Sequence, residues 1–179
     1  LTQSGFSHAG WDWNRYPGTT TIHLPYNELE AKLNQLPSAG IEEMLLSTES
    51  YSGANTLNNN SMFAMKLHGH SKYQQQSLKA NKSYFLFDNR VIALGSGIEN
   101  DDKQHSTETT LFQFAVPKLQ SVIINGKEIN QLGTQLTLNN ADTLIDPAGN
   151  LYKLTKGQTV EFSYQKQHSL DDRNSKPTE

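Results

Sequence analysis

The chain has 179 residues, of which 35% are hydrophobic and 18% are charged, and its formal net charge is -3. A surface that holds nucleic acid is normally basic, so this charge balance argues against a nucleic-acid partner. No stretch approaches the ~20 apolar residues that a membrane-spanning helix needs. The chain also lacks cysteine, which excludes thiol catalysis, thiolate metal sites and disulfides.

Nearly all of the predicted elements are strands. In chain order, β-branched and alternating apolar residues predict single strands at 19–24, 61–69, 107–116 and 157–167. Hairpins are predicted at 82–96, 121–129 and 142–155, with turns at 88–89, 125–126 and 146–149. In the 61–69 strand, alternation predicts that Phe63, Met65 and Leu67 face inward. Helical spacing occurs only at 26–37 and 41–46.

Many short strands joined by hairpins predict an all-β fold, an antiparallel β-sandwich. The polar segment 99–106 is predicted to be a loop. We expect residues 1–9 to be a linker or an edge of the chain, 10–167 to form the sandwich domain, and 168–179 to be a linker or a truncated continuation of that domain.

The stretch from residue 10 to residue 21 reads GWDWNRYPGTTT and holds both tryptophans of the chain. In an extended segment, Trp11 and Trp13 would point the same way and form a large apolar anchor. Arg15 can stack on an indole or pair with Asp12. Pro17 and Gly18 are typical of a type II turn. Two functional interpretations stay open: an aromatic platform for sugar rings, and a cation site formed by Asp12 and Asn14.

Other candidate sites are weaker. His68 and His70 have the spacing of two metal ligands on one face of a strand, but no third ligand lies close in sequence. The paired carboxylates at 42–43 and 101–102 are sequence neighbours, whose side chains diverge in regular structure. Solvated charge is the simpler interpretation of both pairs.

The opening stretch resembles the WDWxRxPGTTT segment of polysaccharide lyase family 8, and within that family the chondroitin sulfate ABC lyases. The similarity continues, in order, through YFLFDNRVIALGSGIEN, STETTLFQF, SVIINGKEI, TLIDPAGNLY and NSKPTE. These segments cover most of the chain from Gly10 onward, while 25–82 is matched less clearly.

The resemblance implies a fold and an activity. The family has an upstream α/α toroid, a central antiparallel sandwich of the galactose-mutarotase-like kind, and a downstream C-terminal β domain. This chain resembles the central sandwich. The family cleaves glycosaminoglycans by β-elimination, so the expected parent protein degrades chondroitin and dermatan sulfate, with hyaluronan as a further candidate. Such enzymes act on extracellular polymer, which implies a secreted or periplasmic bacterial protein without nucleic-acid or membrane partners.

The resemblance also implies roles for residues. The family's catalytic histidine, tyrosine, arginine and glutamate are expected upstream, so no catalytic residue is assigned in this chain. A related chondroitin AC lyase holds calcium near this motif, which makes Asp12 and Asn14 the candidate metal ligands here. The favoured role for Trp11, Trp13 and Arg15 is a joint between sandwich and toroid that supports one wall of the sugar cleft.

Two alternatives to a lyase scaffold are a non-catalytic carbohydrate-binding module and a sugar-epimerising sandwich. The first would bind glycan through the tryptophans and nearby tyrosines. The second would need a histidine and a glutamate on one concave sheet, and the sequence gives no sign of that pairing.

Overall fold

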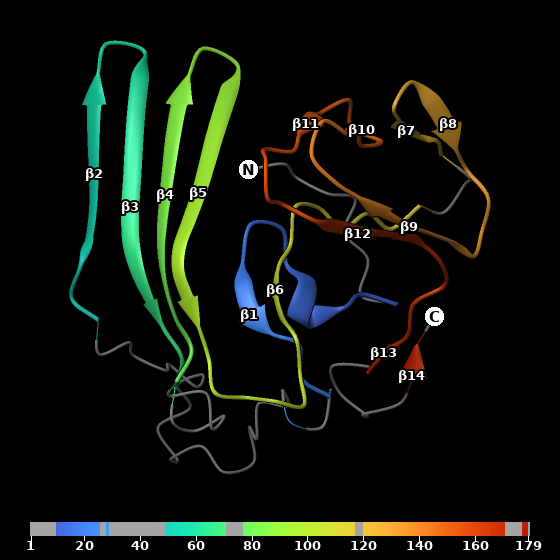
Figure 1. The fold of residues 1–179 in the computed structure, drawn as a ribbon, viewed down its shortest axis with the longest axis horizontal. Coiled ribbons are helices and arrows are strands. Elements are labelled where there is room, and N and C mark those ends of the chain that lie inside the picture. Colours follow the sequence, from blue (N-terminus) through green and yellow to red (C-terminus); the bar gives the residue numbers. More distant parts are fainter. Residues whose placement is uncertain are drawn as a thin grey trace. The chain divides into compact units, whose positions relative to one another are not determined.

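A computed structural model describes residues 10–25, 28, 49–70, 77–116, 120–170 and 177–178 (Figure 1). After one short 3-10 helix, η1 (Trp13–Arg15), the described elements are strands. In chain order they are β1 (Thr20–Ile22), β2 (Ser52–Leu57), β3 (Asn60–His68), β4 (Lys79–Phe87), β5 (Arg90–Glu99), β6 (Thr107–Thr109), β7 (Val122–Ile124), β8 (Lys127–Ile129), β9 (Thr134–Leu138), β10 (Thr143–Ile145), β11 (Leu151–Lys153), β12 (Val160–Tyr164), β13 (Ser169–Leu170) and β14 (Pro177–Thr178). The predicted all-β, antiparallel class is confirmed.

The chain divides into two compact units, and the second is inserted into the first. Unit 1 contains residues 1–19 and 109–179, whereas unit 2 contains residues 20–108. The polypeptide therefore leaves unit 1 after its first segment and returns to it after unit 2 is complete.

Unit 1 has its own small sandwich. One sheet has the strand order β11-β10-β7-β8, and the other pairs β12 with β9. A shared apolar core joins these two sheets, because it takes side chains from strands of both; its buried members are Val122, Ile124, Leu138, Leu144, Phe162 and Tyr164. Interlocking of the inner faces of two sheets is how a β-sandwich removes apolar surface from water.

Unit 2 is dominated by one four-stranded sheet in the order β2-β3-β4-β5, which consists of two adjacent hairpins (Figure 1). Asn58 and Asp88 adopt positive φ angles of 54° and 51° at the two hairpin turns. Asn and Asp tolerate that region better than other non-glycine residues, which explains their presence there. A β-bulge opposite Ala80 ends the regular register between β4 and β5.

Tight turns also fix the hairpins of unit 1. Asn125 and Gly126 join β7 to β8 with φ angles of 50° and 76°. A type I′ turn needs positive φ at both central residues, and Asn-Gly is the pair that adopts it most readily. The three predicted hairpins and the predicted strands near β1, β3 and β12 are all confirmed.

Three details differ from the sequence-based expectations. The strand predicted at 107–116 ends at Thr109, and the rest of that segment is irregular. Strands β2 and β9 were not expected, because their sequences are rich in polar residues and have few apolar positions to alternate. Phe63 is 37% exposed whereas Met65 and Leu67 are half-buried, so the predicted inward face of β3, which pairs with the buried Ala80 and Lys82, is exposed only toward Phe63.

Some expectations lie wholly or largely outside the described residues. These are the helices at 26–37 and 41–46, the edge at 1–9, and most of the 168–179 tail, in which β13 and β14 pair with each other. The predicted domain bounds stay a prediction. No helix in the described part of the chain is long and apolar enough to cross a bilayer.

The turn between β10 and β11 depends on a buried carboxylate. Asp146 is 3% exposed, and its Oδ1 atom accepts hydrogen bonds from the backbone N–H groups of Ala148 and Asn150, each at 2.9 Å. Its Oδ2 atom accepts from Asn150 Nδ2 at 2.9 Å and from the Tyr152 hydroxyl at 3.0 Å. The carboxylate thus accepts the hydrogen bonds that the backbone and side-chain donors of this turn would otherwise make to water.

We predict that Asp146→Ala lowers the free energy of unfolding of unit 1 by about 2–4 kcal/mol, because several partly buried donors lose a charged, buried acceptor. Both tryptophans lie in unit 1, so tryptophan fluorescence during denaturant unfolding measures that unit. The control is Lys156→Ala in an exposed turn, for which a change within about 0.5 kcal/mol is expected. Equal stability of the two variants would contradict the stabilising role of the Asp146 carboxylate in this turn.

Candidate functional site

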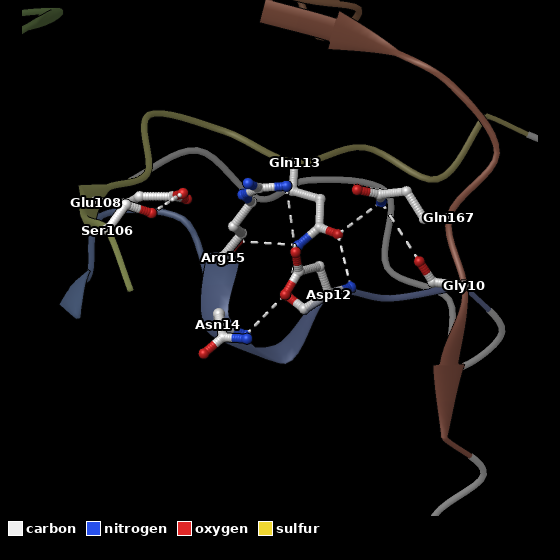
Figure 2. A network of polar contacts seen from close by, with 8 residues as sticks. All are labelled: Gly10, Asp12, Asn14, Arg15, Ser106, Glu108, Gln113 and Gln167. Carbon is white, nitrogen blue, oxygen red and sulfur yellow. Dashed lines mark hydrogen bonds and ion pairs between the residues drawn. The ribbon is translucent and has the colours of Figure 1, made fainter. Parts of the chain in front are cut away.

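A buried side-chain amide joins the tryptophan-containing segment to a distant part of unit 1 (Figure 2), and backbone hydrogen bonds between residues 18–19 and Thr110 add to this attachment. Gln113 is buried, and its Nε2 atom donates to the carbonyl oxygens of Asp12 at 3.0 Å and Arg15 at 2.9 Å. Its Oε1 atom accepts from the Asp12 backbone N–H and from Gln167 Nε2, each at 2.9 Å. Both donors and both acceptor positions of the amide are therefore used.

The same network reaches the start of the described chain. Gln167 Nε2 also donates to the Gly10 carbonyl at 3.3 Å (Figure 2). Segments near residues 10, 113 and 167 are thereby joined within unit 1 by buried and partly buried hydrogen bonds. The function of this arrangement is to fix the backbone around the two tryptophans.

Asp12 caps the short helix η1. Its Oδ1 atom accepts the backbone N–H of Asn14 at 3.0 Å, as a capping carboxylate does. Its Oδ2 atom lies 3.3 Å from Arg15 Nη1, so the predicted pairing of these residues is confirmed. The Asp12 side chain is 6% exposed and the Arg15 side chain 35% exposed, which places the ion pair at the edge of the buried network.

The two tryptophans have different surroundings. Trp11 is 2% exposed and meets Tyr16 edge to face, with ring centroids 6.5 Å apart, whereas Trp13 is 43% exposed. The expected common direction of the two indoles requires an extended segment, and this condition is not met, because Trp13 begins a helical turn. Trp11 is a core residue of the segment, and Trp13 is its accessible indole.

A turn redirects the chain after the helix. Thr19 donates its backbone N–H to the Tyr16 carbonyl at 3.1 Å, and Gly18 has a φ of 86°. Positive φ at the third position of a four-residue turn is the requirement of type II geometry, so the predicted Pro17-Gly18 turn is confirmed.

The candidate metal ligands Asp12 and Asn14 are both buried, at 5% and 3% exposure. Both carboxylate oxygens of Asp12 already have protein partners. Calcium takes six to eight oxygen ligands, and the described residues contain no cluster of three or more potential metal-binding side chains, His68 and His70 included. Calcium binding here stays a prediction with no geometric support from these residues.

The loop predicted at 99–106 is present and is ordered by Asp102. The His105 ring Nδ1 lies 2.8 Å from Asp102 Oδ2, while the backbone N–H groups of Gln104 and His105 donate to Oδ1. These hydrogen bonds, the one from the His105 ring foremost, lower the pKa of the Asp102 carboxyl to about 2. A carboxylate with so low a pKa is a weak base at neutral pH, so this pair is a loop cap.

A buried lysine was missed by the sequence analysis. Lys82 is 6% exposed, its Nζ atom lies 2.6 Å from Thr20 Oγ1, and burial lowers the pKa of its ammonium group. It lies 6.0 Å from the ring centroid of Tyr84, whose pKa burial raises. Alternation along β4 places Lys82 on the same face as Ala80 and Tyr84. This shared face is the sequence signal that could have revealed the burial of Lys82.

The fold and the tryptophan-containing segment together define a class of protein. The described chain is an antiparallel β-sheet protein with one small sandwich and one large sheet. Its tryptophan-containing segment has a structural role and presents one accessible indole, that of Trp13. Residues 6–172 match the family model of the super-sandwich domain of polysaccharide lyase family 8. The chain belongs to polysaccharide lyase family 8.

Three relatives carry chondroitin lyase names. The chain is 96% identical over all of its 179 residues to a chondroitin sulfate ABC exolyase of Proteus vulgaris, and covers 18% of that protein. It is 38% identical to a chondroitin sulfate ABC endolyase of the same organism, over 98% of the chain and 17% of the relative. It is 46% identical to a chondroitin sulfate ABC exolyase of Bacteroides thetaiotaomicron, over 64% of the chain and 11% of the relative. The chain thus spans less than a fifth of the length of each.

We predict that Gln113→Glu destabilises unit 1 nearly as much as Gln113→Ala, by about 2–4 kcal/mol, although it preserves size and shape. A carboxylate only accepts hydrogen bonds, so it would face the carbonyls of Asp12 and Arg15 with no donor. Gln167→Ala removes one peripheral partner and should cost less, about 0.5–1.5 kcal/mol.

Tryptophan fluorescence during urea unfolding measures all three variants. A Gln113→Glu protein as stable as the unmodified chain would show that the amide donors do not hold the segment.

Proposed function

We propose that this chain is the central scaffold of a chondroitin sulfate ABC lyase, and that the full-length protein is an exolyase. The observation that carries the proposal is the 96% identity to the Proteus vulgaris exolyase along the whole chain, against 38% for the endolyase of that organism. The substrate class is chondroitin and dermatan sulfate, and the reaction is β-elimination.

The elimination requires a base that removes the proton at C5 of the uronic acid, charge neutralisation at its carboxylate, and departure of the 4-O-linked sugar. We infer that the groups performing these steps lie upstream, in a helical toroid, and that this chain supplies support. The residues described in unit 1 fit that role, because the polar side-chain atoms of Gln113 and Asp12 form hydrogen bonds to the backbone.

The accessible side chain of this segment is Trp13. We propose that it forms part of the joint with the toroid and of one wall of the sugar cleft, with Arg15 beside it and Trp11 as the buried anchor. Exposure of 43% for Trp13 against 2% for Trp11 supports this division of roles. A large, half-exposed indole is the type of residue that anchors an interface.

A carbohydrate-binding module is the second candidate function. Trp13 and Tyr16 favour it, because both are aromatic and substantially exposed, at 43% and 55%. The net charge of -3 gives it little support for a polyanionic glycan. Binding of chondroitin sulfate by the isolated chain would favour this alternative over the scaffold.

The proposed partners are the toroid upstream, the C-terminal β domain downstream and the glycosaminoglycan itself. The relatives are more than five times as long as the aligned segment, which leaves room for such domains. We propose a secreted or periplasmic bacterial location, because the polymer lies outside the cell.

The first functional prediction concerns activity. We expect the full-length protein to release unsaturated disaccharides from chondroitin sulfate while the residual polymer stays long, as an exolyase does. The 179-residue chain alone, checked for β-structure by circular dichroism, should release none. Absorbance of the unsaturated product and size-exclusion chromatography of the polymer measure the two properties. Turnover by the isolated chain would overturn the scaffold assignment, and rapid shortening of the polymer would overturn the exolyase assignment.

The second functional prediction separates the tryptophans in the full-length protein. Trp11→Ala should destabilise the fold by about 3–5 kcal/mol, because it empties a buried site. Trp13→Ala should leave the isolated chain folded but lower the activity or melting temperature of the full-length enzyme. Leu132→Ala, at another exposed apolar residue, is the control. Unchanged melting and turnover in the Trp13→Ala enzyme would remove Trp13 from the proposed joint.

A further inference from the structure

The turn between β7 and β8 contains a chemically reactive pair of residues that the proposed function does not use. Asn125 is the only asparagine of the chain that is followed by glycine. Both Asn125 and Gly126 are exposed, and a Cβ atom at Gly126 would meet no described atom within 4 Å. An asparagine before glycine loses ammonia more readily than one before any other residue, because no side chain at the second position hinders ring closure.

This loss of ammonia, called deamidation, needs no reactant other than water. The backbone nitrogen of Gly126 forms a bond to Cγ of Asn125, the bond from Cγ to Nδ2 breaks, and ammonia leaves with the proton of the Gly126 N–H group. The product is a five-membered succinimide ring. Water then opens the ring at one of its two carbonyl carbons, which gives either aspartate or isoaspartate. The net change replaces a neutral amide by a carboxylate.

The structure holds the Asn125 amide at both of its ends. Its Oδ1 atom accepts the backbone N–H of Thr143 at 2.9 Å, and its Nδ2 atom donates to Asp142 Oδ1 at 2.8 Å. The Asn125 backbone N–H also donates to the Thr143 carbonyl oxygen at 3.0 Å. A backbone donor and a carboxylate acceptor allow only one orientation of the amide, so its oxygen and nitrogen are both fixed. The amide clamp is defined as these contacts of Asn125 with Asp142 and Thr143.

The acceptor in the amide clamp is itself held in place. Asp142 Oδ2 accepts the backbone N–H of Asn139 at 2.6 Å, and the Asp142 N–H donates to the Asn139 carbonyl oxygen at 3.0 Å. The hydrogen bond from the Asn139 backbone, followed by that from the Asn125 amide, lowers the pKa of the Asp142 carboxyl. Asp142 is therefore ionised at the neutral and alkaline pH at which succinimide forms, and the clamp is present under those conditions.

We infer that Asn125 is a deamidation site, and that the amide clamp restrains its reaction in the folded protein. Ring closure requires Cγ of Asn125 to turn toward the nitrogen of Gly126, and this rotation breaks the hydrogen bonds to Asp142 and Thr143. The turn adds a second restraint, because Asn125 and Gly126 have φ angles of 50° and 76° and connect strands that pair in register. Deamidation is therefore coupled to local opening of the β7–β8 hairpin.

The product does not fit the clamp. A carboxylate at position 125 cannot donate to Asp142, and it places a second negative charge beside that residue. Isoaspartate also inserts one more main-chain carbon into a two-residue turn. Strand β7 supplies Val122 and Ile124 to the core of unit 1, so a turn that cannot close again weakens the attachment of a core strand. Each conversion is irreversible, and the converted fraction increases with every opening of the hairpin.

The first test follows position 125 in the full-length protein during incubation in mildly alkaline buffer. Brief trypsin digestion releases residues 119–127, in which Asn125 is the only asparagine. Mass spectrometry then measures the mass gain from amide to acid, and chromatography separates the aspartate and isoaspartate forms. A synthetic peptide of the same sequence is the unstructured reference. We expect conversion in the folded protein to be at least about tenfold slower than in the peptide, because two hydrogen bonds must open first. Equal rates would overturn the inference.

The second test removes the clamp in the full-length protein. Asp142→Ala and its matched control, Asp146→Ala, each lose a turn carboxylate of unit 1, but only the first loses the partner of Asn125 Nδ2. We expect Asp142→Ala to speed conversion at position 125 at least about fivefold, and Asp146→Ala to change it by less than about twofold. Equal acceleration in both variants would show that general loss of stability governs the reaction, and no acceleration in Asp142→Ala would show that the clamp restrains nothing.

A milder variant covers the case in which Asp142→Ala does not fold, as judged by circular dichroism. Asp142→Asn keeps the size and shape of the side chain but offers one oxygen to the two donors, Asn125 Nδ2 and the Asn139 N–H. Conversion at position 125 should again be faster than in the unmodified protein. A folded Asp142→Asn protein that converts at the unmodified rate would contradict the role of the Asp142 carboxylate.

Discussion

The amide of Gln113 is the interaction on which the tryptophan segment depends. One planar group with two donors and two acceptor positions satisfies two carbonyls, one backbone N–H and one further side chain. Among uncharged side chains, only the shorter asparagine offers the same combination of two N–H donors and a carbonyl acceptor. The helix cap at Asp12 and the ion pair with Arg15 both require the backbone path that this amide fixes.

The two units solve the burial of apolar surface differently. Unit 1 closes its two sheets on a common core, and the buried members of that core come from four strands of those sheets. Unit 2 concentrates its buried residues near β1, around Ile22, Leu24 and Leu78, and leaves the hairpin ends of its large sheet exposed. The large sheet therefore buries apolar side chains at the end near β1 and leaves them exposed toward its hairpin turns.

Local signals made much of this fold predictable. Each hairpin was predictable from its turn residues, because the geometry of a tight turn admits few residue types. These residues are Asp88, Asn125-Gly126 and the turn after Asp146. Strands β2 and β9 carried a weaker signal, because β2 is mostly small and polar and β9 has only two apolar residues, Leu136 and Leu138. The family was recognisable from ordered motifs, and the match over residues 6–172 confirms it.

The candidate site was less predictable than the fold. The pairing of Arg15 with Asp12 could be read from their spacing, but the contrast between Trp11 and Trp13 depends on a helical turn of three residues. The role of Gln113 depends on tertiary structure, because its partners lie between 54 and 101 positions away in sequence. A glutamine in a strand-like segment gives no local sign that its amide is buried.

The insertion of unit 2 into unit 1 affects the order of events during synthesis. Asp12 leaves the ribosome 101 residues before Gln113, a delay of roughly 5 to 20 seconds at ordinary rates of translation. Unit 2, residues 20–108, is synthesised during that interval, and the hydrogen bonds from Gln113 to the tryptophan segment cannot form until the interval ends. Unit 1 is therefore completed late, when the returning chain closes around a segment that was made first.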